Sequence, residues 1–420
     1  MKSKGRRSAG SYMPYGAPYG GPPRALGMAP LAGPPMMPLA PLTGAPSPLA
    51  SVGVFGGMPP EGFRPPPFDR YLCDDLFPIG PPSDDTELAQ QLLSRNEQLT
   101  PSVAEQAAIQ SLITKISQIL EKIVANPDSF TPVAIDEIRE VGSFKKGTML
   151  AKHNVADLLV ILKSLPTTES VNALGQKLVT DLKEEHKEVF GCVTRDFGCE
   201  IAGTQAVVRV LVTIVPQNAA LLEPDLHLAE KVLQSNLATI RHVRWFEEHV
   251  TNTSVKMLVR LLKDLRNRYD DLKPLNSWYI ELLSHYCVMH TRTRKPLPLA
   301  SAYKRFLHIL STGMLLPTSP ALIDPCDPTT RINYKLGHEE MDSICSTAQT
   351  LFRVMMHGGS EHVVGVAKNL INVANELTVW NDIVVTPLEK AYNAVDMEPY
   401  YGKTATSTAA AADTSVTASA

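Results

Sequence analysis

Residues 142–162 read GSFKKGTMLAKHNVADLLVIL and contain a glycine-rich turn followed by a nearly continuous apolar run. The run at 157–162 begins with one aspartate and is otherwise aliphatic. Such a run between turn signals is typical of a strand that is buried on both faces. The pattern therefore predicts a central strand at 157–162, with a loop at 142–148 before it.

The segments before this stretch change from helical to strand-like periodicity. Residues 84–98 have a helical pattern that begins at a capping Asp84 or Asp85. Apolar residues recur at helical spacing through 109–123, which predicts a stronger helix with one wide buried face. Residues 135–141 are short and strand-like, and we expect them to join the same sheet.

The segments after residue 162 predict a change of architecture between Pro216 and Pro224. Before that point we expect a helix at 169–190 and a hairpin around Gly203-Thr204, with arms at 200–202 and 206–215. After it the apolar spacing predicts only helices, at 228–250, 254–269, 275–289, 299–314, 339–357 and 361–377. The prediction is an α+β, bilobed fold: a mixed α/β lobe at 68–223 and an all-helical lobe at 224–392.

The two ends of the chain differ from this body in composition. Residues 1–67 are rich in Pro, Gly and Met, and residues 393–420 are rich in Ala, Ser and Thr. Such segments bury too little apolar surface to offset the entropy lost on ordering, so both are predicted to be disordered tails. The basic N-terminus lacks the apolar region of a secretory signal.

The overall composition excludes several classes of protein. The 40 Lys and Arg residues nearly balance the 43 Asp and Glu residues, so no chain-wide basic field exists for gripping a nucleic acid. No run of about 18 apolar residues is free of charges or breakers, which excludes a transmembrane helix. The six cysteines form no CxxC motif, and Cys192 and Cys199 are too far apart for a zinc site. We expect reduced, buried thiols, as in the cytosol or nucleus.

The glycine-rich turn invites comparison with a P-loop, and it fails that comparison. Its two glycines have the right separation, but Thr148 follows Gly147 where a P-loop requires a lysine. Two readings remain open: a plain turn between strands, or a turn whose backbone N–H groups and Ser143 hydroxyl cradle a phosphate.

The turn and the strand after it together resemble the signature of the nucleotidyltransferases, most closely the oligoadenylate-synthetase branch. A second match, in the predicted helical lobe, comprises KMLVRLLK at 256–263 and LNSWYIELLSHY at 275–286. The resemblance implies that Gly142 and Ser143 hold phosphate oxygens and that Lys263 contacts a nucleoside triphosphate. From spacing alone, Lys256, Arg260 and Lys263 form a basic helix face that solvent could equally cover.

The same resemblance implies a loss of catalytic carboxylates. In that family three carboxylates hold two divalent metals. Here Val155 stands at the first position, Asp157 keeps the second, and Thr213 replaces the third if the strand at 213–216 carries it. Asp157 is then either a structural carboxylate or a weak metal ligand that acts only with bound nucleotide.

From FDRYLCDDLFP at 68–78 to VTPLEKAY at 385–392, the sequence resembles a DZF domain, a catalytically degenerate member of this group. Further distinctive blocks are RNEQLTPSVAEQAAI, RHVRWFEEH and RLLKDLRNRY. The resemblance implies a non-enzymatic nuclear subunit that shuttles to the cytoplasm and pairs with a larger DZF protein bearing double-stranded-RNA-binding domains. RNA or DNA would be bound mainly through that partner, and membranes not at all. It implies no required cofactor, with a nucleoside triphosphate and Mg as the ligand of the site.

The C-terminal helices are predicted to form the partner interface. Their apolar residues recur at helical spacing, although they could equally complete the core of the helical lobe. The expected interface residues are Met341, Ile344, Ala348, Leu351, Phe352, Met355 and Trp380.

Two rival functions remain open at this stage. The first is an active, template-independent nucleotidyltransferase in which a displaced carboxylate, Glu200 or Asp196, completes the metal site. The second is direct binding of RNA or DNA through the basic N-terminal residues, which are Lys2, Lys4, Arg6 and Arg7.

Overall fold

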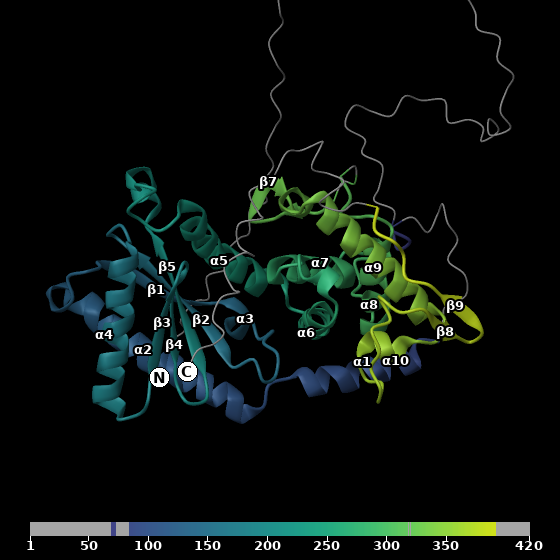
Figure 1. Cartoon of the computed structure of the whole chain (residues 1–420), viewed down its shortest axis with the longest axis horizontal. Helices are drawn as coiled ribbons and strands as arrows, with labels where there is room; N and C mark the ends of the chain where they lie inside the picture. The colour runs from purple at the N-terminus through teal and green to yellow at the C-terminus, as the bar shows by residue number, and fades with distance from the viewer. Residues whose placement is uncertain (1–68, 73–83, 318, 320, 392–420) are drawn as a thin grey trace, which may run out of the picture. The chain divides into compact units, whose positions relative to one another are not determined.

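The computed structural model of the chain describes residues 69–72 and 84–391, apart from 318 and 320 (Figure 1). The predicted tails at 1–67 and 393–420 lie outside the described residues. The described part combines a mixed β-sheet and its covering helices with a second, mainly helical group of elements. The predicted α+β class is therefore confirmed.

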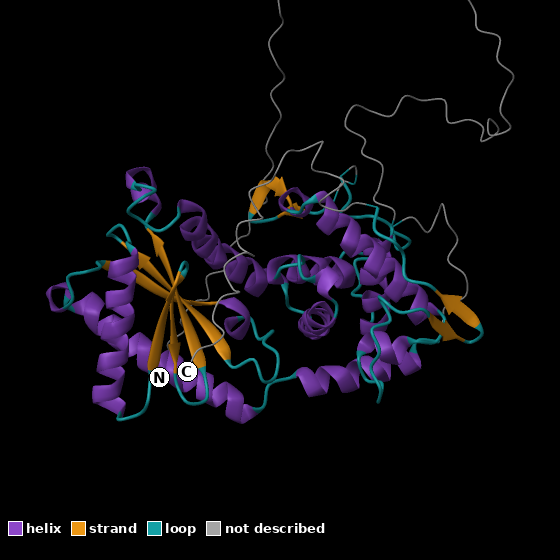
Figure 2. Cartoon of the chain, viewed as in Figure 1, coloured by secondary structure: helices purple, strands orange, loops and turns teal. Residues whose placement is uncertain are grey.

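A five-stranded sheet forms the centre of the α/β lobe (Figure 2). Its strands are β1 (Ile135–Val141), β2 (Val155–Leu162), β3 (Gly191–Arg195), β4 (Gly198–Ala202) and β5 (Val207–Ile214), in the spatial order β1-β2-β5-β4-β3. Strands β2 and β5 are parallel, and the other neighbours are antiparallel. The predicted interior strand is β2, which is buried from residue 156 to residue 162. The predicted β4–β5 hairpin is present, whereas the edge strand β3 was not predicted.

Helices cover both faces of this sheet. Helices α2 (Val103–Ala125) and α4 (Thr168–His186) pack on the face formed by the even-numbered residues of β2, including Leu158 and Val160. Helix α5 (Glu230–His249) packs on the other face, where Val243 contacts Leu159 and Ile161. Since successive side chains of a strand point to opposite faces, Asp157 lies on the α5 side.

Helix α2 shows how directly the sequence specifies this packing. Its N-terminus is fixed by a capping box, in which Ser102 accepts from the backbone of Glu105 and the Glu105 carboxylate accepts in return. Its buried residues are the seven that the helical spacing predicts: Ile109, Leu112, Ile113, Ile116, Ile119, Leu120 and Ile123.

A second apolar core joins the helices of the helical lobe. These are α6 (Thr253–Arg268), α7 (Ser277–Met289), α8 (Leu299–Ser311), α9 (His338–Met356) and the short α10 (Ser360–Val364). The earlier helix α1 (Thr86–Leu99) also belongs to this core, through Leu88, Leu92 and Leu99. The boundary in space therefore differs from the predicted boundary at 223/224, because a segment from the N-terminal side helps to form the helical lobe.

The prediction of an all-helical lobe is wrong in two places. Two small hairpins are present, β6 (Ile323–Asp324) with β7 (Asp327–Arg331) and β8 (Thr378–Trp380) with β9 (Ile383–Val385). The helix expected at 361–377 ends at Val364, because Gly365 adopts a left-handed conformation with φ +86°.

Smaller differences concern helix ends and turns. The expected loop at 142–148 begins with a single helical turn, α3 (Gly142–Lys145), and α4 ends at His186 because Lys187 is left-handed. Short 3₁₀ turns are η1 (Pro127–Ser129), η2 (Pro216–Leu221), η3 (Asp270–Leu272) and η4 (Ile332–Lys335). Among the residues that the structure describes, no helix has the length and apolarity to span a bilayer.

Candidate functional site

The turn that begins with Gly142 and Ser143, here called the glycine-serine turn, lies against Asp157 at the end of β1. Val141, the last residue of β1, pairs with Asp157 of β2, so the chain turns directly beside the carboxylate. Gly142 has φ +76°, and a Cβ at this position would lie 2.0 Å from Asp157 Oδ2. Both the backbone conformation and the close approach require glycine here.

Asp157 is engaged by an arginine of the neighbouring strand. Arg209 of β5 pairs with Asp157 in the parallel register; its Nε donates to Asp157 Oδ1 at 2.7 Å, and its Nη2 forms an ion pair with the same oxygen at 2.6 Å. The Asp157 side chain is 11% exposed. Burial raises the pKa of the Asp157 carboxyl, and the charge and hydrogen bonds of Arg209 partly offset that rise.

This register corrects the predicted position of the third lost carboxylate. Thr213 pairs with Ile161, four residues farther along the strands than the Asp157–Arg209 pair. That separation is about 13 Å at the rise of an extended strand. The Thr213 hydroxyl is buried and donates to the Leu233 carbonyl at 2.8 Å. Arg209, not Thr213, therefore occupies the place beside Asp157.

Val155, the predicted place of the first lost carboxylate, lies in β2 together with Asp157. Val155 precedes Asp157 by two residues on β2, so the two side chains point to the same face of the sheet. A carboxylate at Val155 would thus stand next to that of Asp157. The structure brings Gly142 and Asp157 together, and leaves an aliphatic side chain where the first carboxylate would be.

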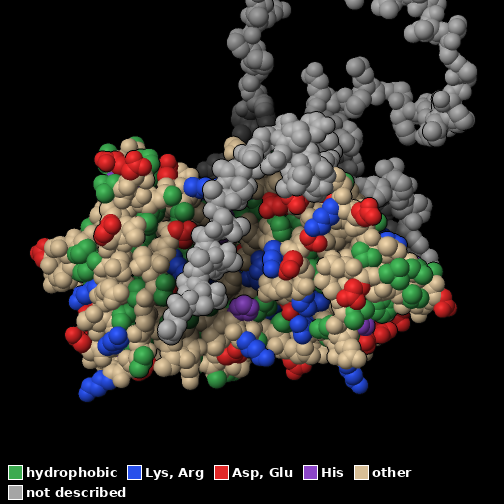
Figure 3. Space-filling view, viewed as in Figure 1, with side chains coloured by type: hydrophobic (Ala, Val, Ile, Leu, Met, Phe, Trp, Pro, Cys, Tyr) green, Lys and Arg blue, Asp and Glu red, His purple; other side chains and the backbone are tan. Residues whose placement is uncertain are grey.

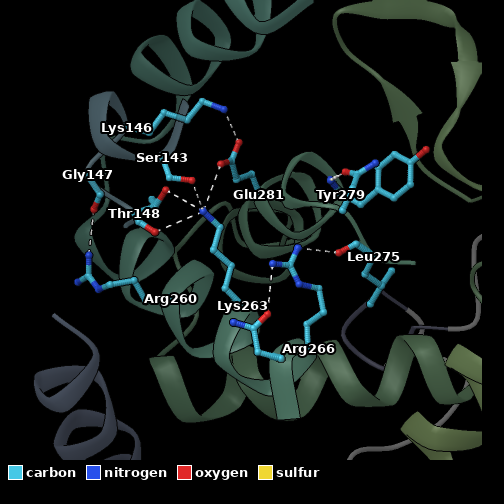
Figure 4. Close-up of polar contacts among 12 residues, drawn as sticks. Ser143, Lys146, Gly147, Thr148, Arg260, Lys263, Arg266, Leu275, Tyr279 and Glu281 are labelled. Carbon is cyan, nitrogen blue, oxygen red and sulfur yellow. Dashed lines mark hydrogen bonds and ion pairs between the residues drawn. The ribbon is translucent and has the colours of Figure 1, made fainter. Parts of the chain in front are cut away.

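Lys263 of α6 joins the helical lobe to the glycine-serine turn (Figure 4). Its Nζ donates to Ser143 Oγ at 2.7 Å, and to both the carbonyl and the hydroxyl oxygen of Thr148 at 3.3 Å. Its side chain is 5% exposed, and burial lowers the pKa of Lys263 to about 8, although Glu281 favours the charged form. The predicted residues Ser143 and Lys263 therefore form one hydrogen-bonded group.

A buried carboxylate, Glu281 of α7, connects two lysines of this group (Figure 4). Lys146 Nζ donates to Glu281 Oε2 at 2.6 Å, and Lys263 Nζ lies 3.9 Å from Glu281 Oε1. Lys146 and Glu281 were not predicted as site residues from the sequence. Glu281 is a charge within an apolar helical pattern, which is a visible signal, but its partner Lys146 lies in the glycine-rich turn 135 residues away.

Two further cations surround the turn. Arg260 Nη1 donates to the Gly147 carbonyl at 3.0 Å, and Lys256 Nζ lies 3.7 Å from the position that a Cβ at Gly147 would take. We call Lys146, Arg209, Lys256, Arg260 and Lys263 the basic junction. Among the residues that the structure describes, the carboxylates that pair with members of this set are Asp157 and Glu281. The excess positive charge favours an anion beside Gly142 and Ser143.

The hollow between β1 and α5 is separate from this group. It lies on the same face of the sheet as Asp157 and is lined by Glu137, Arg139, Lys145, Val243 and Arg244, among others. Its charged side chains are of mixed sign. None of the predicted nucleotide-binding residues lines it.

The predicted partner interface is wrong for most of its residues. The apolar face of α9 packs inside the helical core, because α8 and the η3 turn lie against this helix. Phe352 and Trp380 are partly buried against the same core. The residues that are buried, each at most 8% exposed, are Met341, Ile344, Ala348, Leu351 and Met355.

Apolar side chains are instead exposed around the β8–β9 hairpin (Figure 3). Leu377 is 63% exposed and Val379 is 58% exposed. We define the hairpin surface as Leu370, Ile371, Leu377, Val379, Ile383, Val384 and Leu388, all of them at least 40% exposed. A clustered apolar surface of this kind marks an interaction site or an aggregation liability.

The block around Trp245 forms an aromatic cluster between α5 and α7. Trp245 stacks on His249 and meets His285 edge-on, with ring centroids 5.0 Å apart in both pairs. Arg244 pairs with Glu248 on the same helix. Trp245 and Arg244 thus have partners within the chain itself.

Cys199, Cys287 and Cys345 fit the prediction of buried thiols, whereas Cys192 and Cys326 are only partly buried. Cys192 and Cys199 are both free, and Cys199 is fully buried. Burial and the neighbouring Cys192 raise the pKa of the Cys199 thiol. Within the described ranges, no group of three or more His, Cys, Asp or Glu side chains is placed to hold a metal ion.

Comparison with known proteins identifies the family. The structure of the CdnC:HORMA-deltaN complex of E. coli MS115-1 is 14% identical, covers 66% of this chain and 94% of that chain, and gives a TM-score of 0.48. The Cid1 poly(U) polymerase bound to Mg and 3′-dATP is 12% identical, covers 65% and 95%, and gives a TM-score of 0.45. Two family models match the sequence itself: the DZF N-terminal domain over residues 58–251 and the DZF C-terminal domain over residues 254–386. Because these two models span most of its length, the chain belongs to the DZF domain family.

Proposed function

We propose that this chain is a non-catalytic DZF subunit that retains a weak nucleotide site and pairs with a larger DZF protein. In this proposal the partner carries the double-stranded-RNA-binding domains and makes most contacts with RNA or DNA. The sequence blocks of the chain resemble those of interleukin enhancer-binding factor two. That resemblance favours a role in transcription regulation and RNA metabolism, in the nucleus with shuttling to the cytoplasm.

The observation that carries the non-catalytic assignment is the pairing of Asp157 with Arg209. Two-metal transfer of a nucleotide needs several carboxylates that converge on the metals. Here the neighbouring positions carry Val155 and Arg209, and the guanidinium occupies one oxygen of the remaining carboxylate. Losing such charge stabilisation raises the barrier by several kcal/mol.

The rival enzyme with a displaced carboxylate is disfavoured by the sheet order. Glu200 of β4 pairs with Arg209, so β5 separates it from Asp157. Its carboxylate accepts two hydrogen bonds from Arg195, at 3.1 Å and 3.0 Å. Asp196 lies in the β3–β4 turn, where it accepts from the Phe197 backbone.

A transfer assay tests this part of the proposal. The purified full chain is incubated with each nucleoside triphosphate, Mg²⁺ or Mn²⁺ and an oligonucleotide primer. We expect no product above that of the Asp157→Asn variant, since the site lacks metal ligands. Nucleotidyl transfer that is lost in Asp157→Asn would contradict the proposal.

The pairing surface that we propose is the hairpin surface rather than the face of α9. An edge hairpin with exposed aliphatic residues can bury them only against another molecule. Interfaces of permanent complexes are rich in such apolar area. Deleting residues 339–392 would not test this surface, because it would also remove α9 from the core.

Co-expression with a larger DZF subunit, followed by size-exclusion chromatography with light scattering, tests the pairing. We expect a one-to-one heterodimer, which the double variant Val379→Asp/Val384→Asp should abolish. Val189→Asp is the matched control, because Val189 is 77% exposed and lies outside the hairpin surface. Removal of residues 1–67 should leave pairing intact. A hairpin variant that still pairs would refute the assignment of this surface.

Direct binding of nucleic acid remains a second candidate. The residues that motivate it, Lys2, Lys4, Arg6 and Arg7, lie outside the described residues. Binding of a double-stranded RNA to the chain alone, measured at several salt concentrations, distinguishes the two. Binding that weakens steeply with salt and disappears on removal of the first ten residues would favour it over the partner-mediated proposal.

A further inference from the structure

The divalent metal that serves the catalytic relatives of this fold does not fit the residues of this chain. A metal ligand must present a free carboxylate oxygen. Asp157 Oδ1 accepts from Arg209 Nε at 2.7 Å, and Arg209 Nη2 lies 2.6 Å from the same oxygen, while Asp157 Oδ2 lies close to Gly142. A metal at Asp157 would therefore have to compete with the Arg209 guanidinium for this carboxylate. The prediction that Asp157 holds a metal with bound nucleotide is not supported by this arrangement.

The sheet places a fixed positive charge where a metal would otherwise neutralise phosphate. Asp157, Arg209 and Glu200 lie in one row across β2, β5 and β4, and paired residues of neighbouring strands point to the same face. Arg209 therefore stands between two carboxylate-bearing strands. Its side chain is 41% exposed, and the hydrogen bond to Asp157 uses one of the five N–H bonds of a guanidinium.

Lysines on the other side of the turn extend this charge. Lys263 reaches Ser143 at 2.7 Å, and Lys146 shares Glu281 with Lys263. A buried ammonium is costly unless it is paired, and here two ammoniums share one carboxylate. An anion beside Ser143 would compensate the second of them.

We infer that the basic junction binds the triphosphate of a nucleotide without a divalent metal, and that the Arg209 guanidinium takes the place of the metal. This inference rests on the proposed nucleotide site and specifies its ligand as the free polyanion. Arginine suits that role, because its planar donors bind phosphate oxygens in pairs. A free nucleoside triphosphate also carries more negative charge than its Mg²⁺ complex, so an excess of protein cations favours the free form.

Isothermal titration calorimetry of the full chain with ATP tests the inference, once in EDTA and once in excess MgCl₂. We expect binding in EDTA that is as tight as in MgCl₂ or tighter. Affinity that falls about tenfold or more when Mg²⁺ is removed, a difference of about 1.4 kcal/mol, would overturn the inference. Absence of binding in both conditions would overturn it as well.

Variants of Arg209 assign the effect to this residue. Arg209→Met keeps the aliphatic stem and should weaken ATP binding in EDTA by about tenfold or more. Arg209→Lys retains a charge for Asp157 and should keep a substantial part of the affinity, which covers the case in which Arg209→Met does not fold. Arg195→Met is the control, because Arg195 is also a strand arginine paired with a carboxylate. If Arg209→Lys and Arg209→Met both bound ATP in EDTA as tightly as the wild type does, the assignment to Arg209 would be overturned.

These outcomes are independent of the other proposals. Transfer activity is read in a product assay, and pairing is read as a mass in solution. A chain that pairs and is inactive, yet binds ATP only with Mg²⁺, would refute the inference and leave the proposed function intact. A chain that binds ATP in EDTA but transfers nucleotides would refute the non-catalytic assignment instead.

Discussion

At the scale of single residues, the buried ammonium group of Lys263 links the helical lobe to the glycine-serine turn. Its ammonium is stabilised by Glu281 and by the oxygens of Ser143 and Thr148, while burial and the nearby Lys146 act against it. The result is a lysine whose pKa is lowered to about 8. Such a group changes its charge close to physiological pH.

We therefore expect nucleotide affinity to depend on pH. As the pH rises from 7 to 9, Lys263 with its pKa of about 8 loses its proton, so ATP binding weakens. The sign is opposite for the ligand-free fold: the folded pKa lies below the unfolded value of 10.5, so the free energy of unfolding rises as pH increases from about 8 to 10.5. Calorimetry across this range measures the first effect. A Lys263→Met variant with the same pH dependence as the wild type would assign it to another group.

Most residues of the candidate site could be predicted from the sequence, but Arg209 could not. Gly142, Ser143, Asp157 and Lys263 were all predicted, because a family signature carries them, and the structure joins them in one group. Arg209 was missed, although a charge within the apolar strand VVRVLVTI is a visible signal. The signal lacked a partner, since nothing in the sequence places Arg209 beside Asp157.

At the scale of elements, the register of β5 explains the error at Thr213. Side chains alternate with a period of two, so a shift by an even number of residues leaves the same side chains facing the core. Arg209 and Thr213 are four residues apart, and both lie on the α5 side of the sheet. The hydrophobic pattern fixes the face of β5 but not its register on β2, which only the tertiary structure provides.

The β8–β9 hairpin begins directly after the helix expected at 361–377, and it was not predicted. Its turn carries the decisive local signal, in which Asn381 and Asp382 are left-handed with φ 46° and φ 64°. Two left-handed residues between paired strands form the turn that matches the natural twist of a hairpin, and Asn and Asp favour it. Turn chemistry was thus more informative here than periodicity.

This turn makes a prediction about stability. Replacing Asn381 by Ala places a side chain with no local hydrogen bond in a left-handed conformation and removes the 2.9 Å bond to the His357 carbonyl. We expect the free energy of unfolding to fall by about 1–2 kcal/mol. Urea denaturation measures it, with Asn218→Ala as a control at a residue that also donates to a carbonyl but has no left-handed backbone. A larger loss in the control would contradict the explanation.

At the scale of the whole molecule, the described N-terminal segment closes the helical lobe. Asp69 accepts from Arg305 of α8 at 2.7 Å, and both side chains are at most 1% exposed. The Tyr286 hydroxyl also donates to Asp69, at 3.0 Å. Asp69 and Arg305 are separated by 236 positions, so this ion pair could not be predicted from the sequence. The lobes are therefore continuous in space but not in sequence.

We expect this contact to be essential for stability. Asp69→Asn leaves the Arg305 guanidinium buried without a counter-charge, and breaking such a pair costs about 3–5 kcal/mol. A truncation that removes residues 1–67 should have little effect on the thermal midpoint, whereas removal of residues 1–83 should lower it strongly. Thermal unfolding of the wild type, of Asp69→Asn and of the two truncated chains measures these midpoints. Similar midpoints for the two truncations would contradict the role of Asp69.

The proposed lack of catalysis and the proposed metal-free ligand both require that Arg209 stands where a metal would otherwise bind. Mn²⁺ titration followed by electron paramagnetic resonance measures metal binding to the wild type, to Asp157→Asn, and to Val155→Asp/Arg209→Asp, which restores the carboxylates. We predict that the wild type binds no more Mn²⁺ than Asp157→Asn, while the double variant gains a site. A stoichiometric Mn²⁺ site in the wild type that Asp157→Asn removes would contradict this account.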